Sequence, residues 1–494
     1  MCLTSPDYFF HMKNKIILIL LLLNQFAFSQ ESSFEFQSTQ NSAQVAWEAI
    51  QDSQGNYVIT SQINDGESGQ SNPRLWKLDE DGNLIISQNI EYNNLSVSAF
   101  FLKEIDDHYI CIGNAINLSK DSSFVWIAEI SMDLNLLKDT LIYSGNLEIG
   151  PMQCNDELNT EILCLGNFVG LSGLPNIPFG FKHFIESGNT EFNYNLGVTD
   201  LINDIIPHPQ DSNKYILNGQ RTYKSDENFN ILDFIESPGV FRLRQQGDIH
   251  PLTDSTFLIS GKYSNLLSGE RYIGLGIASY DLEEIKLDTF GRMGDTIDFP
   301  GFFQSIDFKT KDKIYCGGTS NIQIIASPPY GTMPSWFVLA QYDSLLNRNW
   351  KQYYGGDAYY NMFGLIATQD DGCLMYGRRH DYQNNPGILE LYVLKVNAGG
   401  QLVSTTTLPL YEDDFVVYPN PFNDQIHINV SDKIPTQNFQ VELYDLQGKL
   451  LITTKVNDNS FIINTNTLAV GAYICVIKNQ QGEVLGKRKL IKSR

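Results

Sequence analysis

The sequence contains few cysteines and far fewer basic than acidic residues. Its 494 residues include 7 cysteines, and 34 lysines and arginines stand against 57 aspartates and glutamates, so the formal net charge is −23. No two cysteines have the C-x-x-C spacing of zinc sites. Since a surface of this charge repels phosphate groups, the composition argues against a nucleic-acid partner and against binding to anionic membranes.

Sequence patterns of common catalytic sites are also missing. We find no G-x-S-x-G, H-E-x-x-H or P-loop pattern, and no two histidines have the spacing of metal ligands. The stretch DEDGN, Asp79 to Asn83, is rich in oxygen atoms but lacks the length and the bidentate glutamate of an EF-hand loop. We interpret it as a hairpin corner. The sequence therefore identifies no catalytic residue, no metal ligand and no cofactor.

Long apolar runs are limited to one, near the N-terminus. Two lysines precede the apolar run Ile16–Leu23, and the small residues of the sequence AFS precede Gln30. This run is too short to cross a membrane, and its flanks are typical of a signal peptide. We predict a signal peptide over residues 1–29, with Met12 as an alternative start of translation.

The six cysteines beyond the signal peptide are expected to be free. Most of them occupy apolar, strand-like runs, in which a cysteine behaves as a small buried hydrophobic residue. Cys154 and Cys164 could face each other across a hairpin. A large core does not need a disulfide, so we do not expect one there.

A repeat organises residues 31 to about 410. A short strand that usually ends in glycine recurs, as in HYICIG, EILCLG and KYILNG, which end at Gly113, Gly166 and Gly219. A second apolar strand runs in phase with it and ends in a turn rich in Asp, Asn and Gly, the residues that tight hairpins need. Each unit of about fifty residues therefore reads as four antiparallel strands.

Seven such units in series predict an all-β protein with a seven-bladed β-propeller over residues 31–410. A closed ring buries both faces of each blade and protects the sheet edges. Units of this length are too long for the coils of a β-solenoid and too short for independent sandwiches. Two segments compete to supply the strand that closes the ring, namely 33–39 and 401–408.

The loops between second and third strands are long and variable, and all of them should emerge on one face. Long loops on a rigid scaffold often carry binding residues. We predict a binding cluster made of Arg378, Arg379, His380 and Tyr382, with Tyr330 from a neighbouring loop. The competing interpretation is a solvated loop with local salt bridges. Three tryptophans occupy matching places on third strands, which favours packing between blades over binding of sugars.

The last eighty residues change character. The segment YPNP, Tyr418 to Pro421, is followed by alternating strands separated by polar turns. Prolines favour extended backbone and remove hydrogen-bond donors, so they mark a stiff boundary. The pattern predicts a linker over 411–417 and a small Ig-like β-sandwich over 418–494.

This tail resembles the type A C-terminal sorting domain of the type IX (Por) secretion system of Bacteroidetes. The matching segments are YPNP, LYDLQGKLL, LAVGAYICVI and KRKLIK, and the residues that carry the resemblance are Tyr418, Pro419, Asn420, Pro421, Tyr444, Asp445, Gly448, Gly471, Tyr473 and Lys487. The resemblance implies recognition by the outer-membrane translocon. It also implies removal of the domain by a sortase-like peptidase, and release or attachment to surface lipopolysaccharide.

These observations together suggest a protein that is secreted or held at the outer-membrane cell surface. We expect a non-catalytic binding or adhesion propeller whose partner is a glycan or a protein. The alternative is a secreted hydrolase or lyase acting on polysaccharides, whose acidic residues converge only in three dimensions.

Overall fold

The computed structural model describes residues 32–38, 44–64, 70–145, 148–155, 160–169, 177–193, 196–199, 201–211, 214–219, 221–235, 243–244, 247–264, 271–291, 297–323, 331–402, 415–419, 422–430, 439–445, 449–456, 460–478 and 484–493. The chain forms two compact units, residues 1–403 and 404–494. The predicted signal peptide lies outside the described residues. In the described part of the chain, no helix is long and apolar enough to cross a membrane.

The described strands of the first unit form seven antiparallel sheets. The first three sheets contain β2 (Gln44–Gln51), β3 (Tyr57–Asn64), β4 (Ser71–Leu78) and β5 (Leu84–Asn89); β6 (Leu95–Ile105), β7 (His108–Asn117), β8 (Ser123–Ser131) and β9 (Leu136–Gly145); and β10 (Glu148–Ile149), β11 (Gln153–Asn155), β12 (Glu161–Val169), β13 (Ile177–Phe184) and β14 (Thr190–Asn193).

The next three sheets have the same order. They contain β15 (Ile202–Pro207), β16 (Lys214–Gly219), β17 (Thr222–Asp226) and β18 (Ile231–Ile235); β19 (Leu243–Arg244), β20 (Ile249–Thr253), β21 (Thr256–Ser264), β22 (Arg271–Ser279) and β23 (Glu284–Phe290); and β24 (Phe299–Pro300), β25 (Ile306–Asp307), β26 (Ile314–Ser320), β27 (Trp336–Tyr342) and β28 (Arg348–Gly355). Where a sheet has five strands, its innermost strand is divided into two short pieces that pair with the same neighbour.

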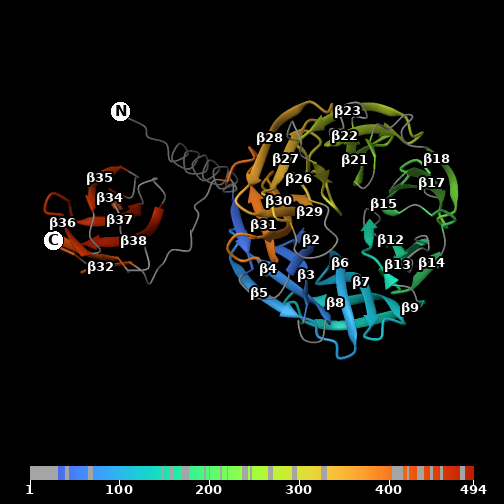
Figure 1. The fold of residues 1–494 in the computed structure, drawn as a ribbon, viewed down its shortest axis with the longest axis horizontal. Helices are drawn as coiled ribbons and strands as arrows, with labels where there is room; N and C mark the ends of the chain where they lie inside the picture. Colours follow the sequence, from blue (N-terminus) through green and yellow to red (C-terminus); the bar gives the residue numbers. More distant parts are fainter. Residues whose placement is uncertain are drawn as a thin grey trace, which may run out of the picture. The chain divides into compact units, whose positions relative to one another are not determined.

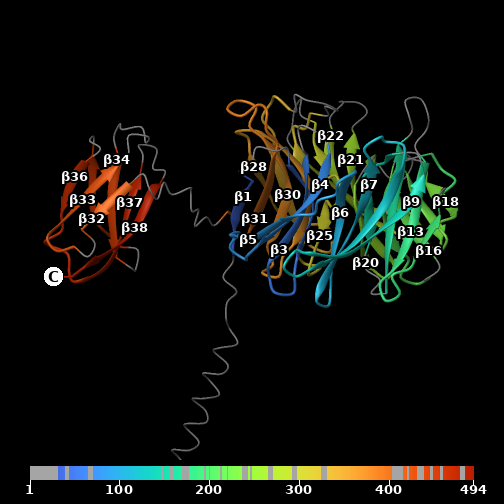
Figure 2. The same cartoon turned by 90° about the horizontal axis from the view of Figure 1, so that it is seen from below.

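The sheets stand side by side around a common axis, with β2, β6 and β29 (Tyr359–Ala367) among the strands nearest the centre (Figures 1 and 2). Consecutive strands pair within each sheet, and no strand pairs across sheets in the described residues. This is the architecture of a β-propeller, so the predicted all-β fold class is confirmed.

The first strand of the chain completes the last sheet. β1 (Phe34–Gln37) pairs with β31 (Glu390–Val396), which follows β29 and β30 (Cys373–His380). Phe34 is 8% exposed, and its ring lies 5.5 Å from that of Tyr57 in the adjacent sheet. One of the two predicted closing segments, 33–39, thus supplies the outer strand. Most of the other, 403–408, lies outside the described residues.

The glycine at the end of the recurring strand lies opposite a β-bulge in the innermost strand. The pairing skips one residue at Phe100, opposite Gly113, and again at Phe363, opposite Gly377. A Cβ atom added to Gly113 or Gly377 would lie 1.8 or 2.1 Å from a backbone carbonyl oxygen of the bulged strand. The repeated glycine is therefore required by the close approach of two backbones.

Neighbouring blades are joined by repeated polar contacts. A side-chain amide on the second strand of one blade donates to a backbone carbonyl of the next blade's innermost segment, as Asn114, Asn167 and Asn218 do. Between the last and first blades, the hydroxyl of Tyr376 donates to Glu48 Oε1 at 2.9 Å. These contacts give polar groups between neighbouring blades their hydrogen-bond partners.

The hairpin corners use one arrangement several times. The Oδ1 atoms of Asp79, Asp226 and Asp343 each accept hydrogen bonds from the backbone N–H groups two and four residues later, at 2.8 to 3.0 Å. The stretch DEDGN therefore has the geometry of the other corners, as its interpretation as a hairpin corner requires.

Two of the three tryptophans on third strands, Trp76 and Trp126, lie between blades. Trp126 is buried in a cluster with Val58 and Leu75 of the preceding blade, whereas Trp76 packs with Phe34 and Leu391 of the last blade. Their indole N–H groups donate to hydroxyl groups of the protein. These two residues therefore serve packing between blades.

One expectation about the cysteines was wrong. Cys154 and Cys164 form a disulfide, with their Cα atoms 4.0 Å apart. The two residues face each other directly because β11 and β12 pair as neighbouring strands. Cys111, Cys316, Cys373 and Cys475 are free and buried.

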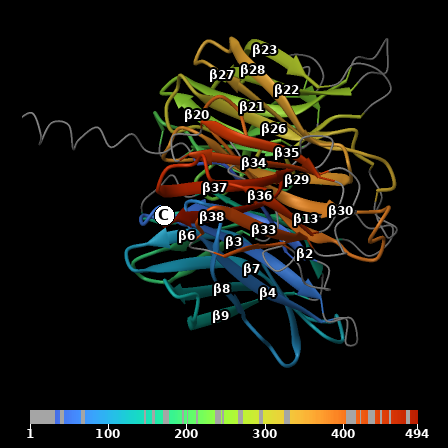
Figure 3. The same ribbon diagram turned by 90° about the vertical axis from the view of Figure 1, so that its left-hand side faces the viewer.

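The second unit has two sheets that share a core. One contains β32 (Phe415–Tyr418), β33 (Gln425–Val430) and β36 (Ser460–Asn464); the other contains β34 (Phe439–Asp445), β35 (Leu450–Val456), β37 (Gly471–Lys478) and β38 (Val484–Lys492) (Figures 2 and 3). Ile426 and Ile428 of the first sheet pack with Val441, Leu443 and Cys475 of the second. The described strands thus form a small β-sandwich.

A candidate binding site in the central channel

The bulges of the innermost strands turn aromatic side chains into the channel. A bulge bends its strand and redirects one side chain, and Trp47, Phe100 and Phe363 occupy the extra position in their strands. The ring of Trp47 lies 5.1 Å from that of Phe100, 5.6 Å from that of Phe303 and 5.4 Å from that of Phe363. These four residues, here called the aromatic cluster, fill one level of the channel.

Phe303 reaches this cluster through an excursion of the backbone. Between β24 and β25 the chain leaves its own sheet, and Phe303 N donates to Phe363 O at 2.8 Å while Leu365 N donates to Gln304 O at 2.9 Å. From the third blade, Gln153 Nε2 donates to Phe303 O. The excursion is thus held by two other blades, which fixes the aromatic cluster in place.

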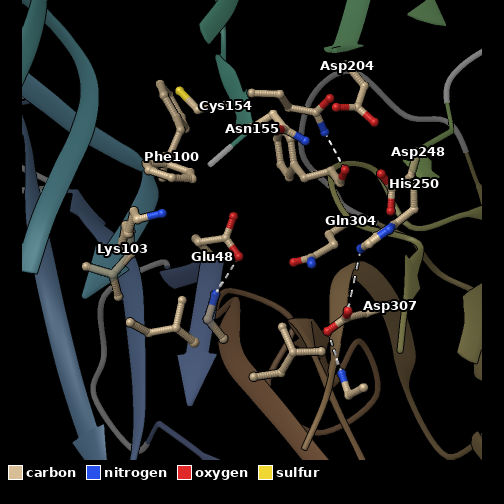
Figure 4. A pocket seen from close by; sticks show the side chains of 18 of the residues that line it. Glu48, Phe100, Lys103, Cys154, Asn155, Asp204, Asp248, His250, Gln304 and Asp307 are labelled. Carbon is tan, nitrogen blue, oxygen red and sulfur yellow. Dashed lines mark hydrogen bonds and ion pairs between the residues drawn. The ribbon is translucent and has the colours of Figure 1, made fainter. Parts of the chain in front are cut away.

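A cavity of about 400 Å³ lies next to the aromatic cluster (Figure 4). Its charged lining residues are Glu48, Lys103, Glu104, Asp204, Asp248, His250, Asp307 and Lys309. Phe100, Phe303, Gln153, Asn155 and Gln304 supply aromatic and amide surface. This volume lies within the range of about 300 to 1,000 Å³ that is usual for sites of small molecules.

Two buried carboxyl groups meet on one wall of the cavity. Asp204 and Asp248 are each 7% exposed, and the charge of Asp204 acts on Asp248. Asp204 Oδ2 accepts from Ile249 N at 2.7 Å, and Asp248 Oδ2 accepts from Ser305 N at 3.1 Å and Ile306 N at 2.9 Å. Each carboxyl group therefore joins its blade to the innermost strand of the next.

Burial decides the protonation of this pair. Loss of hydration raises the pKa of Asp204 to about 6. Burial, together with the charge of Asp204, raises the pKa of Asp248 well above its ordinary value. Two adjacent carboxyl groups cannot both ionise at low cost, so the pair holds one proton near neutral pH.

Asp307 continues the same arrangement in the sixth blade. Its Oδ2 accepts from Ala367 N of the seventh blade at 2.7 Å, and its Oδ1 lies 3.9 Å from His250 Nε2. A carboxylate beside an imidazole can orient that ring and exchange a proton with it. The cavity therefore offers acceptors for cationic or hydroxyl groups. In the described part of the chain, no group of three or more acidic, histidine or cysteine residues could hold a metal ion.

Arg379, from the predicted loop-face cluster, is surrounded by acidic groups. Its guanidinium lies 3.0 Å from Asp357 and from Glu390, and 3.7 Å from Asp381. Its Nε donates to the hydroxyl of Tyr360 at 3.2 Å, and the side chain is 13% exposed. The charge of Arg379 is thus compensated within the protein, which fits the local salt bridges of the competing interpretation.

The other predicted binding residues are brought together only in part. His380 is buried, and its two ring nitrogens lie 3.2 and 3.1 Å from backbone carbonyl oxygens. Tyr382 is half-buried, with its ring 6.4 Å from that of His380. The guanidinium of Arg378 lies 5.5 Å from the ring centre of Phe363, in the aromatic cluster. Tyr330 lies outside the described residues.

The residues of the predicted sorting motif lie on several strands of the second unit. Tyr418 ends β32 and stacks on His427 at 5.3 Å. Asp445 ends β34, and its Oδ1 accepts from Lys449 N at 2.9 Å, a bond to the residue four positions later like those of the propeller corners. Pro419 follows β32, and Lys487 lies in β38 opposite Val476. Asn420, Pro421 and Gly448 lie outside the described residues.

Three further motif residues are found in β34 and β37. The hydroxyl of Tyr444 donates to Glu442, which also forms an ion pair with Lys478 at 2.7 Å. Tyr473 is 6% exposed and donates to a backbone carbonyl four residues earlier. A Cβ atom added to Gly471 would meet no heavy atom within 4 Å. Tyr473 thus contributes to the core, whereas Gly471 fills no packing role.

The channel residues were not among the predicted site residues. Asp204, Asp248 and Asp307 lie in the innermost segments of three consecutive blades, but these segments differ in sequence and in length. The bulge at Trp47 leaves no pattern in the sequence either. A useful signal would have been an acidic residue in the first strand of successive repeats.

Comparison with known proteins identifies the tail. Residues 416–493 match the family model of the secretion system C-terminal sorting domain. The resemblance seen in the sequence is therefore confirmed, and the domain implies export by type IX secretion to the cell surface or the medium. No curated protein matches the chain.

Two solved structures similar to this chain are a WD40 domain and a β-propeller domain. The WD40 domain of coronin from Toxoplasma gondii is 9% identical, with 74% of this chain and 86% of that chain covered and a TM-score of 0.43. The β-propeller domain of the Trilobed protease from Pyrococcus furiosus is 11% identical, with 76% and 99% covered and a TM-score of 0.39. The assignment of the propeller fold rests on the sheet order of the chain itself.

Proposed function

We propose that the chain is an exported, non-catalytic binding propeller that acts at the outer-membrane cell surface or in the medium. Residues 31–410 form its seven-bladed body, 411–417 the linker, and 418–494 an Ig-like sorting domain. The translocon recognises the sorting domain and a sortase-like peptidase removes it. The body then meets its ligand, a glycan or a protein.

The hydrogen bonds accepted by the three aspartates of the cavity wall are the observation that supports binding over catalysis. Asp204, Asp248 and Asp307 each accept backbone N–H groups of the following blade. These contacts join the blades, so the three carboxyl groups have a structural role in the ring. The cavity beside them offers fixed acceptors, which suit recognition.

The loop face supplies the second part of the proposal. Arg378 and Tyr382 lie at and beyond the end of β30, on the side of the long loops, and both are partly exposed. They contact the partner there, while Arg379 and His380 hold the loop through the bonds described above. Tyr330 belongs to the same proposed surface.

The test uses the mature protein collected from the medium or the cell surface. It is incubated with a panel of polysaccharides to detect cleavage, and in parallel it is applied to a glycan array. Binding without cleavage supports the proposal, and loss of that binding in the Arg378→Ala/Tyr382→Ala variant assigns it to the loop face. Cleavage that disappears in a variant of one channel carboxylate contradicts it.

A second function, hydrolysis or elimination at a polysaccharide, is favoured by one observation. The Asp204–Asp248 pair holds a proton, and His250 with Asp307 lies on the same cavity wall. Cleavage of a glycosidic bond uses two carboxyl groups that flank the bond, one protonated and one ionised, and the Asp204–Asp248 pair and Asp307 supply carboxyl groups at two places on this wall. The Asp248→Asn variant would then lose cleavage while retaining its fold.

A further inference from the structure

Three acidic groups elsewhere in the described residues that are buried or largely buried have a basic partner. Asp52 lies 3.0 Å from Lys77, Asp370 lies 2.9 Å from Lys395, and Glu442 lies 2.7 Å from Lys478. Burial of a charge is costly unless the charge is paired. These three pairs, found in both units, follow this rule.

The Asp204–Asp248 pair departs from it. Among the described residues, no lysine or arginine lies within 4.0 Å of either carboxyl group, although both are buried and both line the cavity. His250 is the basic group whose charge acts on Asp204, and Asp307 faces His250 from the next blade. The pair thus has a neighbouring imidazole and no permanent cation.

The cavity is also accessible from one side. Its walls are the later halves of β2, β6 and β29, which lead into the short hairpin turns, and the aromatic rings of Phe100 and Phe303 lie at its inner end. The strands enter these turns on the face opposite the long loops, because consecutive strands are antiparallel. A ligand therefore enters from the turn face.

The charge of the wall favours a cation. Among the described lining residues, five carboxyl groups stand against two lysines and one histidine. With one proton on the Asp204–Asp248 pair, the wall keeps a net negative charge. The net charge of the whole chain, −23, adds a field of the same sign.

We propose that the cavity binds a small organic amine, which enters from the turn face and supplies the cation that the Asp204–Asp248 pair lacks. This inference rests on the proposed binding function and names the class of its ligand. The ammonium group lies against the pair, and the carbon skeleton lies against the rings of Phe100 and Phe303.

Binding is linked to a proton. An ammonium ion next to the pair favours its doubly ionised form, so the shared proton is released when the amine binds. Since the pKa of Asp204 is raised to about 6 and that of Asp248 is raised well above its ordinary value, affinity rises as pH increases through about 6. At lower pH, the protonated carboxyl groups of the pair no longer attract the cation.

The test is isothermal titration calorimetry on the full mature chain. The probes are methylammonium, ethanolamine, 1,4-diaminobutane and glucosamine, each compared with the neutral analogue in which a hydroxyl replaces the amino group. At least one amine should bind about tenfold or more tightly than its neutral analogue, a difference of about 1.4 kcal/mol. Asp248→Asn should abolish that preference. Asp81→Asn, the same substitution at an exposed site, should preserve it.

The outcomes separate this inference from the proposed function. If no amine is preferred while a glycan or another neutral ligand binds, the inference is wrong and the binding function stands. If neither amines, neutral analogues nor arrayed glycans bind, the binding function is wrong as well. Thermal unfolding of Asp248→Asn shows whether the variant is folded; an unfolded variant is replaced by Asp204→Asn, to which the same criteria apply.

Discussion

The closure of the ring by the N-terminal strand can be tested at Phe34. Its side chain is 8% exposed, and it packs between the last blade, through β1, and Tyr57 of the first blade. Truncation of a buried phenylalanine to alanine removes its transfer free energy and leaves a cavity, which together cost about 3 to 5 kcal/mol. We therefore expect Phe34→Ala to lower the free energy of unfolding by about 3 kcal/mol, the lower end of this range, because Phe34 lies at the rim of the core.

Urea unfolding followed by tryptophan fluorescence measures this loss. Phe234→Ala is the matched control, because Phe234 also lies on an outer strand but is 44% exposed, and its truncation should cost well under 1 kcal/mol. Equal midpoints for the two variants would refute the reasoning, because Phe34 would then contribute no more to closing the ring than a surface residue does.

Three further predictions concern a buried ion pair, the Asp204–Asp248 pair and the sorting domain. Lys77→Met leaves Asp52 buried without its cation, so the free energy of unfolding should fall by about 3 kcal/mol. The double variant Lys77→Met/Asp52→Asn should recover part of this loss. Equal stability of the two variants in urea unfolding would contradict the prediction. Because the pKa values of Asp204 and Asp248 are raised in the folded protein, their protonation stabilises the fold at low pH, and this stabilisation is lost as pH rises through about 6. The unfolding temperature of Asp248→Asn should therefore change less with pH than that of the unmodified protein. Deletion of residues 415–494 should leave a folded propeller in the periplasm, and its appearance in the medium on fractionation would argue against the sorting role.

The repeat was readable because it obeys local rules. Glycine recurs at Gly113, Gly219 and Gly377, and at each of these places a Cβ atom would collide with a neighbouring backbone. Asp and Asn recur at the hairpin corners because their side chains bind the turn's own N–H groups. Such requirements act within a few residues, so they are visible in a single sequence.

The site was not readable in the same way. The Asp204–Asp248 pair forms between residues of two blades, and its raised pKa values depend on burial by the whole ring. Phe303 reaches the channel through a backbone excursion that pairs with another blade. Arg379 was predicted as a binding residue from its charge alone. Its ion-pair partners Asp357 and Glu390 lie on either side of it in the chain, and their pairing with it appears only in the folded protein.

The disulfide illustrates the same distinction. Its two cysteines are ten residues apart, which permits a hairpin but does not determine the register of its strands. A shift of one residue would turn one cysteine to the other face of the sheet. The pairing of Cys154 opposite Cys164 fixes that register, and no property of the sequence alone requires it.

The most direct test of a binding channel is the number of protons released when a ligand occupies it. Calorimetric titration of the mature protein with 1,4-diaminobutane at pH 7, in two buffers of different ionisation enthalpy, gives this number. The account predicts release of about one proton per bound amine, since the Asp204–Asp248 pair gives up its shared proton, and no release from Asp248→Asn. Binding without proton release in the unmodified protein, or equal release from the variant, would contradict it.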